Sequence, residues 1–452
     1  MLPVTMNIRI LAVVILALAN FLAWPAHAQQ TQALIRDAEI ESDIRGWISP
    51  VFTAAGLDAS FVKLYLVNDN QINSFVAGGQ RIFINTGTLL RSETPNMVIG
   101  VLAHETGHIA GGHLLRMQEA LSTASAESIA GFLLGAAAAV FSRDGQPLAG
   151  GAIAGMTMAQ RSLFAYSINQ EARADEAALS FLDRTHQSAR GLLKFFKILE
   201  GEEVLLPDNQ DPYLRTHPLT SERIEYVQRH VDSSPWSNVK DTPEHQVQHD
   251  RMVAKLKGFL EPPAKVLQEY PPSDHSLYAR YARAAAYHRM PEDDKALAEM
   301  DSLLKDYPKD PYFWELRAQI YFESGRIAQS VAPYRMAVSL APNQPLLHME
   351  LATALIEANE GQANAHEAEA EAKRAVELDD QDPDAWHALG IAEGRLGDTG
   401  NASVALAQEA MIAGDRHTAA QESAIAIKLL KRGSPGWLRA DDIRSTLKID
   451  KP

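Results

Sequence analysis

Two histidines in the stretch "VLAHETGHIAGGH" stand four residues apart, and an acidic residue follows the first of them. On a helix, positions i and i+4 share one face, so His104 and His108 can both bind one zinc ion at about 2.0–2.1 Å. Glu105 lies one step around the helix axis, too far round for a metal ligand but well placed for a general base that activates water. The stretch therefore predicts a hydrolytic zinc site.

Such a site needs a third protein ligand. In the metzincin pattern a third histidine closes the motif, but here Leu114 stands in that place and His113 falls one residue short. We therefore interpret His113 as a helix-face histidine. The alternative is a carboxylate on a second helix, which would complete a set of two histidines and one glutamate.

The stretch "SLFAYSINQEARADEAALSFL" offers that carboxylate on a predicted helix rich in alanine, a composition suited to close packing. Glu171 and Asp175 are four residues apart on one face of this helix. Glu171 can bind the metal, while Asp175 can accept an N–H from a ligand histidine and fix its tautomer. A salt-bridged helix surface is the alternative interpretation of such a pair.

Helices and strands around these residues can be predicted from the spacing of apolar side chains. A helix is expected over 33–55, broken near Pro50, and another over 96–121 that carries the two histidines. Strands are expected at 64–67 and 81–84, because turn-forming Asn, Asp and Gly residues bound these short apolar runs. The catalytic half of the chain is therefore predicted to be mainly α with a small β-sheet.

Two further apolar segments bear on export and membranes. In residues 1–28, Arg9 precedes an apolar run, and Ala26 and Ala28 match a cleavage signature, so we expect a signal peptide cut after Ala28; an uncleaved anchor is the alternative. The runs within 128–160 are each shorter than the roughly 17–25 residues of a membrane span. They predict a helical hairpin that is either buried or in peripheral contact with a membrane.

Composition excludes several classes of function. The chain has 452 residues and no cysteine, which rules out thiol catalysis and zinc bound by cysteine. Its formal charge of −15 argues against nucleic acid or anionic lipid as a bulk electrostatic partner.

Beyond a proline-rich junction near Pro262, helical segments recur with a fixed period. The pairs 34 residues apart are Ala284 and Ala318, Tyr287 and Tyr321, and Pro308 and Pro342. Trp314 and His348 occupy the same position in successive repeats, 34 residues apart. Trp386 occupies this position in the next repeat, 38 residues after His348, so that repeat unit contains four inserted residues. This period resembles the tetratricopeptide repeat, whose helix pairs stack into a solenoid. We expect a metallopeptidase domain over 29–262 and an all-α repeat domain over 263–452.

The spacing of His-Glu-x-x-His and a later Glu-x-x-Ala-Asp resembles the gluzincin peptidases related to the CAAX prenyl endopeptidases and to heat-shock membrane protease X. The resemblance implies one Zn²⁺ per chain in a zincin-like domain. The implied zinc ligands are His104, His108 and Glu171, the catalytic base is Glu105, and the carboxylate behind the ligands is Asp175.

The stretch "RTHPLTSERI" resembles a Thr-His-Pro segment of these peptidases and implies that His217 lies near the metal. There it could donate a hydrogen bond to an oxyanion, or it could fill the fourth zinc position at rest. A loop histidine before a helix capped by Thr220 or Ser221 is the alternative.

A signal peptide and C-terminal repeats together narrow the resemblance to the periplasmic, β-barrel assembly-enhancing type of these peptidases. This implies a periplasmic endopeptidase, associated with the outer membrane, whose substrates are misfolded or stalled outer-membrane proteins. The repeats would dock unfolded clients or the β-barrel assembly machinery. The rival function is a chaperone or scaffold in which the solenoid acts and the peptidase site is latent.

Overall fold

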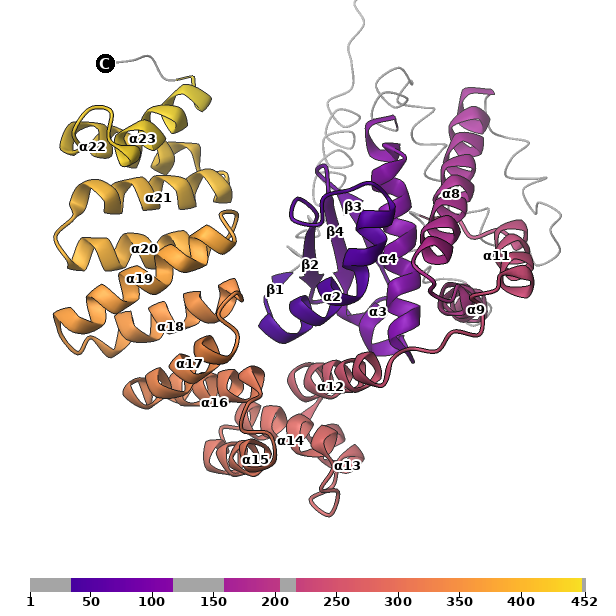
Figure 1. Ribbon diagram of the computed structural model, residues 1–452, viewed down its shortest axis with the longest axis horizontal. Helices are drawn as coiled ribbons and strands as arrows, with labels where there is room; N and C mark the ends of the chain where they lie inside the picture. The colour runs from indigo at the N-terminus through magenta and orange to yellow at the C-terminus, as the bar shows by residue number, and fades with distance from the viewer. Residues whose placement is uncertain (1–33, 117–157, 204–216, 449–452) are drawn as a thin grey trace, which may run out of the picture.

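A computed structural model describes residues 34–116, 158–203 and 217–448 of the chain. Its N-terminal part holds a small sheet among helices, and its C-terminal part is a curved stack of helix pairs, so the expected fold class is confirmed (Figure 1). The predicted signal peptide and nearly all of the 128–160 hairpin lie outside the described residues. Within the part that is described, no helix is both long and apolar enough to cross a membrane.

Four strands form the sheet, in the order β1-β2-β4-β3. They are β1 (Leu34–Ile35), β2 (Lys63–Val67), β3 (Ser74–Ala77) and β4 (Arg81–Asn85). β2 pairs with β4 in parallel, and β3 pairs with β4 antiparallel and forms one edge. The prediction found β2 and β4 to within one residue but missed β1 and β3, because two and four residues are too few to show an alternating pattern.

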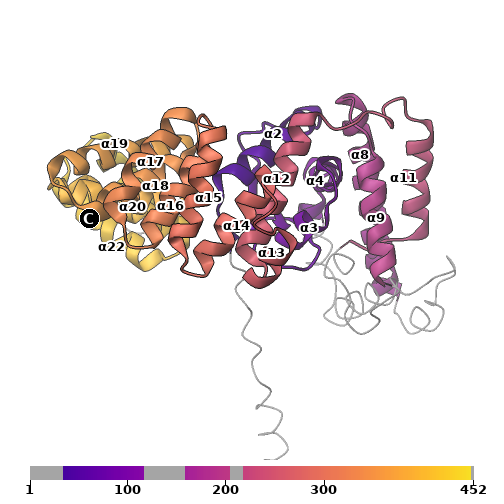
Figure 2. The same ribbon diagram turned by 90° about the horizontal axis from the view of Figure 1, so that it is seen from below.

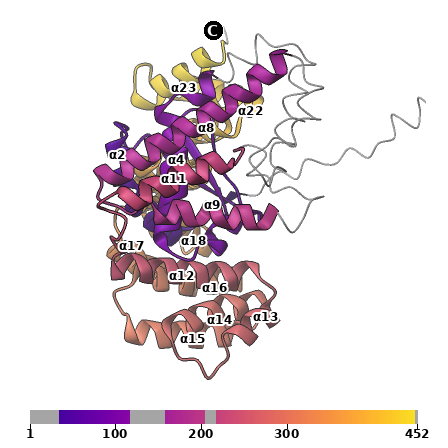
Figure 3. The ribbon, with the colours of Figure 1, turned by 90° about the vertical axis from the view of Figure 1, so that its right-hand side faces the viewer.

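The remaining elements of this part are helices. They are α2 (Ala38–Ala54), α3 (Thr86–Arg91), α4 (Pro95–Ala110), α8 (Met158–Arg184), α9 (Arg190–Glu203) and α11 (Ser221–Ser233). α4 is buried on all sides from Met97 to Gly107 and packs against α2, α8 and α9, so it is the central helix (Figure 3). Among the described residues, one apolar core cluster has members from Ile40 in α2 to Leu256.

Two predicted helix boundaries were wrong. The first helix begins at Ala38 and continues through Pro50, which is exposed, because Trp47, Ile48 and Val51 on the opposite face are buried and hold the helix together. The histidine-bearing helix is broken after Ala110, residues 113–116 are helical again, and residues 117–121 of the predicted helix lie outside the described part of the chain. Gly112 has a φ of +62°, a left-handed conformation that ends a helix.

The second part of the chain is a row of antiparallel helices (Figure 2). They are α12 (Pro243–Leu260), α13 (Pro263–Glu269), α14 (Leu277–Arg289), α15 (Asp293–Asp306), α16 (Pro311–Glu323), α17 (Ile327–Leu340), α18 (Pro345–Ala358), α19 (Gln362–Leu378), α20 (Pro383–Arg395), α21 (Thr399–Ala413), α22 (Arg416–Leu429) and α23 (Pro435–Thr446). α18 is one residue longer than α16 and α19 three longer than α17, which accounts for the four inserted residues.

Three residues predicted to share one phase of the repeat make the same contact. Trp314, His348 and Trp386 each place a ring nitrogen 2.9–3.0 Å from the backbone carbonyl six residues earlier. A histidine can thus replace the tryptophan because its Nε2 reaches the same kind of acceptor. Positions that are equivalent in the sequence repeat therefore make equivalent hydrogen bonds in the structure.

A buried group of charged and polar side chains, which we call the junction cluster, joins the two parts of the molecule. Its members are Asp37 and Glu39 at the start of α2, Arg251 and Lys255 of α12, Tyr281 of α14 and Glu315 of α16. Lys255 is almost fully buried and its Nζ lies 2.8 Å from Asp37 and 3.5 Å from Glu39. The peptidase part and the repeats are consequently joined by a network of charges that is largely buried.

Candidate metal centre

The histidine motif itself allows α4 and α8 to approach closely. Gly107 lies between Glu105 and His108, and a Cβ built there would stand 2.7 Å from the carbonyl oxygen of Ala174 in α8. Only glycine fits that gap, since carbon and oxygen atoms cannot approach so closely. The backbones of the two helices therefore meet where Glu171 lies, one turn before Ala174.

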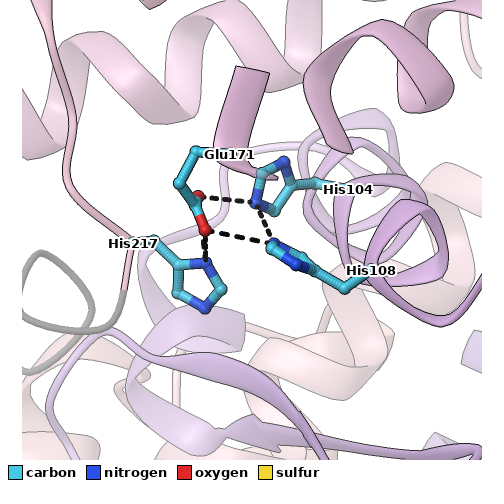
Figure 4. Close-up of side chains that lie close together, drawn as sticks. All are labelled: His104, His108, Glu171 and His217. Atoms are coloured by element: carbon cyan, nitrogen blue, oxygen red, sulfur yellow. Dashed lines mark hydrogen bonds and ion pairs between the residues drawn. The ribbon is translucent and has the colours of Figure 1, made fainter. Parts of the chain in front are cut away.

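Four side chains from three separate segments converge at this contact (Figure 4). The Nε2 atoms of His104 and His108 are 3.1 Å apart, and each lies 3.3 Å from an oxygen of Glu171. Nδ1 of His217 lies 3.2 Å from the same carboxylate. Ligand atoms bound at about 2.0–2.1 Å to a tetrahedral zinc ion are about 3.3 Å from one another, so the donor atoms of His104, His108 and Glu171 fit such an ion.

Asp175 supports the cluster from behind. Its carboxylate lies 2.9 Å from Nδ1 of His104, so it can hold this ring with Nε2 facing the other donors. The other partner of Asp175 is Arg223 of α11, whose Nε and Nη2 donate to it at 2.6 and 2.9 Å. Arg223 also lies 3.1 Å from Glu171 and donates to the carbonyl of Pro218 at 2.7 Å. One guanidinium thus fixes both carboxylates and the loop that carries His217.

Glu105 is fully buried beside the cluster but does not belong to it. Neither of its carboxylate oxygens accepts a hydrogen bond from any residue that the structure describes, and Nε2 of His217 lies 3.7 Å from one of them. Burial raises the pKa of Glu105 to about 7. A buried carboxylate without a donor is costly unless another group completes its surroundings. This one is placed to take a proton at the edge of the site.

The electrostatics of the cluster favour a cation at its centre. Burial alone would raise the pKa of Glu171, but His217 and Arg223 hold it well below its usual range. Burial opposes charge on His104 as well, yet Asp175 and Glu171 outweigh it and raise the pKa of this histidine to about 10. Burial lowers the pKa of His108 far below its usual value, which keeps that imidazole neutral, as a metal ligand must be.

His113 lies at the start of the helical turn that follows the break at Gly112, as a helix-face histidine would. Its ring is nevertheless buried and lies 3.1 Å from His108, which the sequence did not indicate. Arg223 was missed altogether. Its signal was present, since Arg223 lies in register with the buried Val227 and Val231 of α11, on a face where an arginine needs a partner.

The fold and the site define a class: a His-Glu-x-x-His metallopeptidase domain joined to a helical repeat. The model of peptidase family M48 matches residues 35–231, and a tetratricopeptide-repeat model matches residues 273–411. The chain therefore contains an M48 peptidase domain followed by tetratricopeptide repeats.

Three relatives carry the words beta-barrel assembly-enhancing protease in their names. The protein of Vibrio cholerae is 26% identical over 260 residues, which cover 55% of this chain and 52% of the relative. The protein of Yersinia pestis is 22% identical, with 65% and 60% covered. The protein of Escherichia coli K12 is 22% identical, with 83% and 76% covered. The matched region thus spans between about half and three quarters of the relatives' own length.

Proposed function

We propose that the chain is a zinc-dependent endopeptidase of the periplasm that degrades misfolded or stalled outer-membrane proteins and assists their assembly through its repeats. The observation that carries the peptidase part is the convergence of His104, His108 and Glu171 beside the buried carboxylate of Glu105. A site that only stored or carried a metal would have no use for a general base held next to it.

The residues have separate roles in this proposal. His104, His108 and Glu171 would hold zinc, and the absence of cysteine leaves a nitrogen and oxygen donor set that is typical of catalytic zinc. Zinc supplies a Lewis acid that polarises the scissile carbonyl and makes water more acidic. Glu105 takes the proton from the attacking water and passes it to the leaving amine, for which a pKa near neutrality is suited.

The substrates, partners and compartment are supported by other observations. The relatives' names refer to assembly of β-barrels, and the N-terminal residues have the composition of an export signal. The repeats form a curved row of helix pairs, an architecture that binds extended partners on its concave side. An unfolded outer-membrane protein, held by the repeats and cut in the adjoining domain, fits these features.

Replacing the proposed base tests the catalytic assignment. Glu105→Gln should keep the fold and one zinc ion per chain but should lose cleavage of a casein-like substrate, because an amide cannot accept the water's proton. Metal analysis of the same preparation provides the control. Cleavage at the wild-type rate by the purified variant would remove Glu105 from this role.

The same variant separates the peptidase from the rival scaffold function. In cells that lack the wild-type protein, Glu105→Gln should fail to clear stalled outer-membrane proteins if cleavage is the function. If the inactive variant restores barrel assembly as well as the wild type does, the repeats act as a scaffold and the peptidase site is latent.

A further inference from the structure

The ring of His108 has one nitrogen inside the cluster and one outside it. Nε2 faces His104 and Glu171, whereas Nδ1 lies 3.1 Å from Nδ1 of His113. The rings of His108 and His113 meet edge to face, with centroids 5.0 Å apart and planes at 82°. The outer nitrogen of His104 faces Asp175 in the same way. Each of the two histidines thus has one polar partner behind it.

Two consecutive glycines make the approach of His113 possible. Gly112 adopts the left-handed φ of +62° that turns the chain after α4. Gly111 has an ordinary helical φ of −72°, but a Cβ there would stand 2.3 Å from Nε2 of His113 and 2.7 Å from its Cδ2. Gly111 is therefore needed for space and not for its backbone conformation. Its missing side chain leaves room for the ring that reaches back to His108.

We propose that His113 is a positioning residue that fixes the ring of His108 for metal binding, by accepting a hydrogen bond from Nδ1–H of His108. The inference rests on the proposed metal site. When Nε2 of a histidine binds a metal, its proton resides on Nδ1, and the group that accepts this proton sets the tautomer and the orientation of the ring. His113 then carries its own proton on Nε2.

An imidazole suits this position better than another carboxylate does. Glu105, Glu171 and Asp175 are already buried within the site, and Arg223 is the cation that contacts two of them. A further carboxylate would add a fourth buried negative charge to the site, with its own cost of leaving water. A neutral acceptor orients His108 without that cost.

Three variants of the full chain separate the roles of the ring, of its acceptor atom and of the space it needs. His113→Leu removes the acceptor. His113→Asn keeps one, because the Asn oxygen can stand where Nδ1 stands. Gly111→Ala keeps His113 but displaces its ring, and Gly46→Ala in α2 is the matched control, since a Cβ at Gly46 meets nothing within 4 Å.

The measurements are zinc affinity by competition with a chromogenic chelator, the visible spectrum of the cobalt-loaded protein, and the melting temperature of the metal-free protein. We expect His113→Leu and Gly111→Ala to weaken zinc binding by about 10–100-fold and to change the cobalt spectrum. His113→Asn should recover most of the affinity. Melting temperatures of the metal-free proteins should stay close to that of the wild type.

Two results would overturn the inference. One is wild-type zinc affinity in His113→Leu. The other is an equal loss of affinity and melting temperature in the Leu and Asn variants, which would make His113 a packing residue only. A wild-type protein that binds no zinc would instead refute the proposed function itself, so the two failures can be told apart.

Discussion

Glu171 and Asp175 are the same kind of group on the same face of α8, yet their surroundings differ. Glu171 faces the nitrogens of three histidines, whereas Asp175 faces the outer nitrogen of His104 and the guanidinium of Arg223. A carboxylate among ring nitrogens can share a metal ion with them. A carboxylate behind a ring can only orient it.

Replacing each carboxylate should therefore have effects of different size. Glu171→Ala should lower both zinc content and peptidase activity strongly, because two histidines alone hold the ion poorly. Asp175→Asn should cost about 10–100-fold in metal affinity or activity. Metal analysis and peptide cleavage assays on both variants check this. Stoichiometric zinc in Glu171→Ala would mean that another residue is the ligand.

His217 lies between the proposed ligand Glu171 and the proposed base Glu105, at 3.2 and 3.7 Å. We expect His217→Ala to reduce kcat by about 10²–10³ on a short unfolded peptide, because a donor to the oxyanion would be lost. An increase in rate would show instead that His217 closes the site at rest. An unchanged rate would leave it the role of a loop residue.

A site residue could be predicted from the sequence when the residue that it acts with lies close to it along the chain. His104 with His108, and Glu171 with Asp175, are pairs within one helix, so their spacing alone indicated a shared face. Arg223 and His113 act through contacts that follow from the packing of α11 on α8 and from the turn at Gly112. The period of α11 places Arg223 on its buried face, but no local period identifies the partners of Arg223 or of His113.

At the scale of elements, helix α2 contains two buried acidic residues, Glu39 and Asp43. Asp43 is 7% exposed, and burial, with Glu39 nearby, raises its pKa to about 8. An unfolded aspartate has a pKa near about 3.9. The folded protein therefore holds a proton that the unfolded chain releases between these two values. The contribution of Asp43 to the free energy of unfolding is fully present below about pH 4 and is lost as the pH rises through about 8.

We expect Asp43→Asn to reduce this dependence on pH. The free energy of unfolding of the wild type should fall with rising pH, by up to about 1.4 kcal/mol per pH unit from this group between the two pKa values. The variant should show a smaller slope and become relatively more stable at pH 9 than at pH 5. Urea unfolding at both pH values measures this, with the exposed Asp232→Asn as control. Equal slopes for wild type and variant would contradict it.

Elements were predicted well where one period extends over many residues. A 34-residue recurrence predicts the repeat helices, and an unbroken apolar run predicts the central helix. The short strand β3 and the end of α4 were not predicted, because each depends on a few residues. The pairing of β3 with β4 and the φ of Gly112 are properties of the folded chain.

At the scale of the whole molecule, the boundary near residue 262 does not separate two independent bodies. α12 packs most extensively on α14 and also contacts α2, α3 and α4. Its Arg251 and Lys255 pair with Glu39 from the peptidase part and lie near residues of the repeats. Removal of the repeats would expose these charges and part of the core, so a shortened chain is a poor test of the peptidase alone.

The junction cluster should contribute several kcal/mol to the free energy of unfolding of the intact chain. Lys255→Met leaves the buried carboxylates of Asp37, Glu39 and Glu315 without their ammonium partner, which should lower the free energy of unfolding by about 3–5 kcal/mol. Urea unfolding measures the loss. Lys257→Met on the same helix breaks only a partly exposed pair with Glu269 and should cost less than about 1 kcal/mol. Similar losses for both variants would contradict a special role for the cluster.

The apolar core that joins Ile40 to Leu256 also sets an order of events during synthesis, which begins at the N-terminus. The motif with His104 and His108 emerges long before Glu171 and His217, and α2 cannot complete its packing until α12 has followed. During that interval the chain carries only two of the four side chains that converge in the folded protein. The order of these residues along the polypeptide therefore delays the complete donor set until α8 and the segment with His217 have been made.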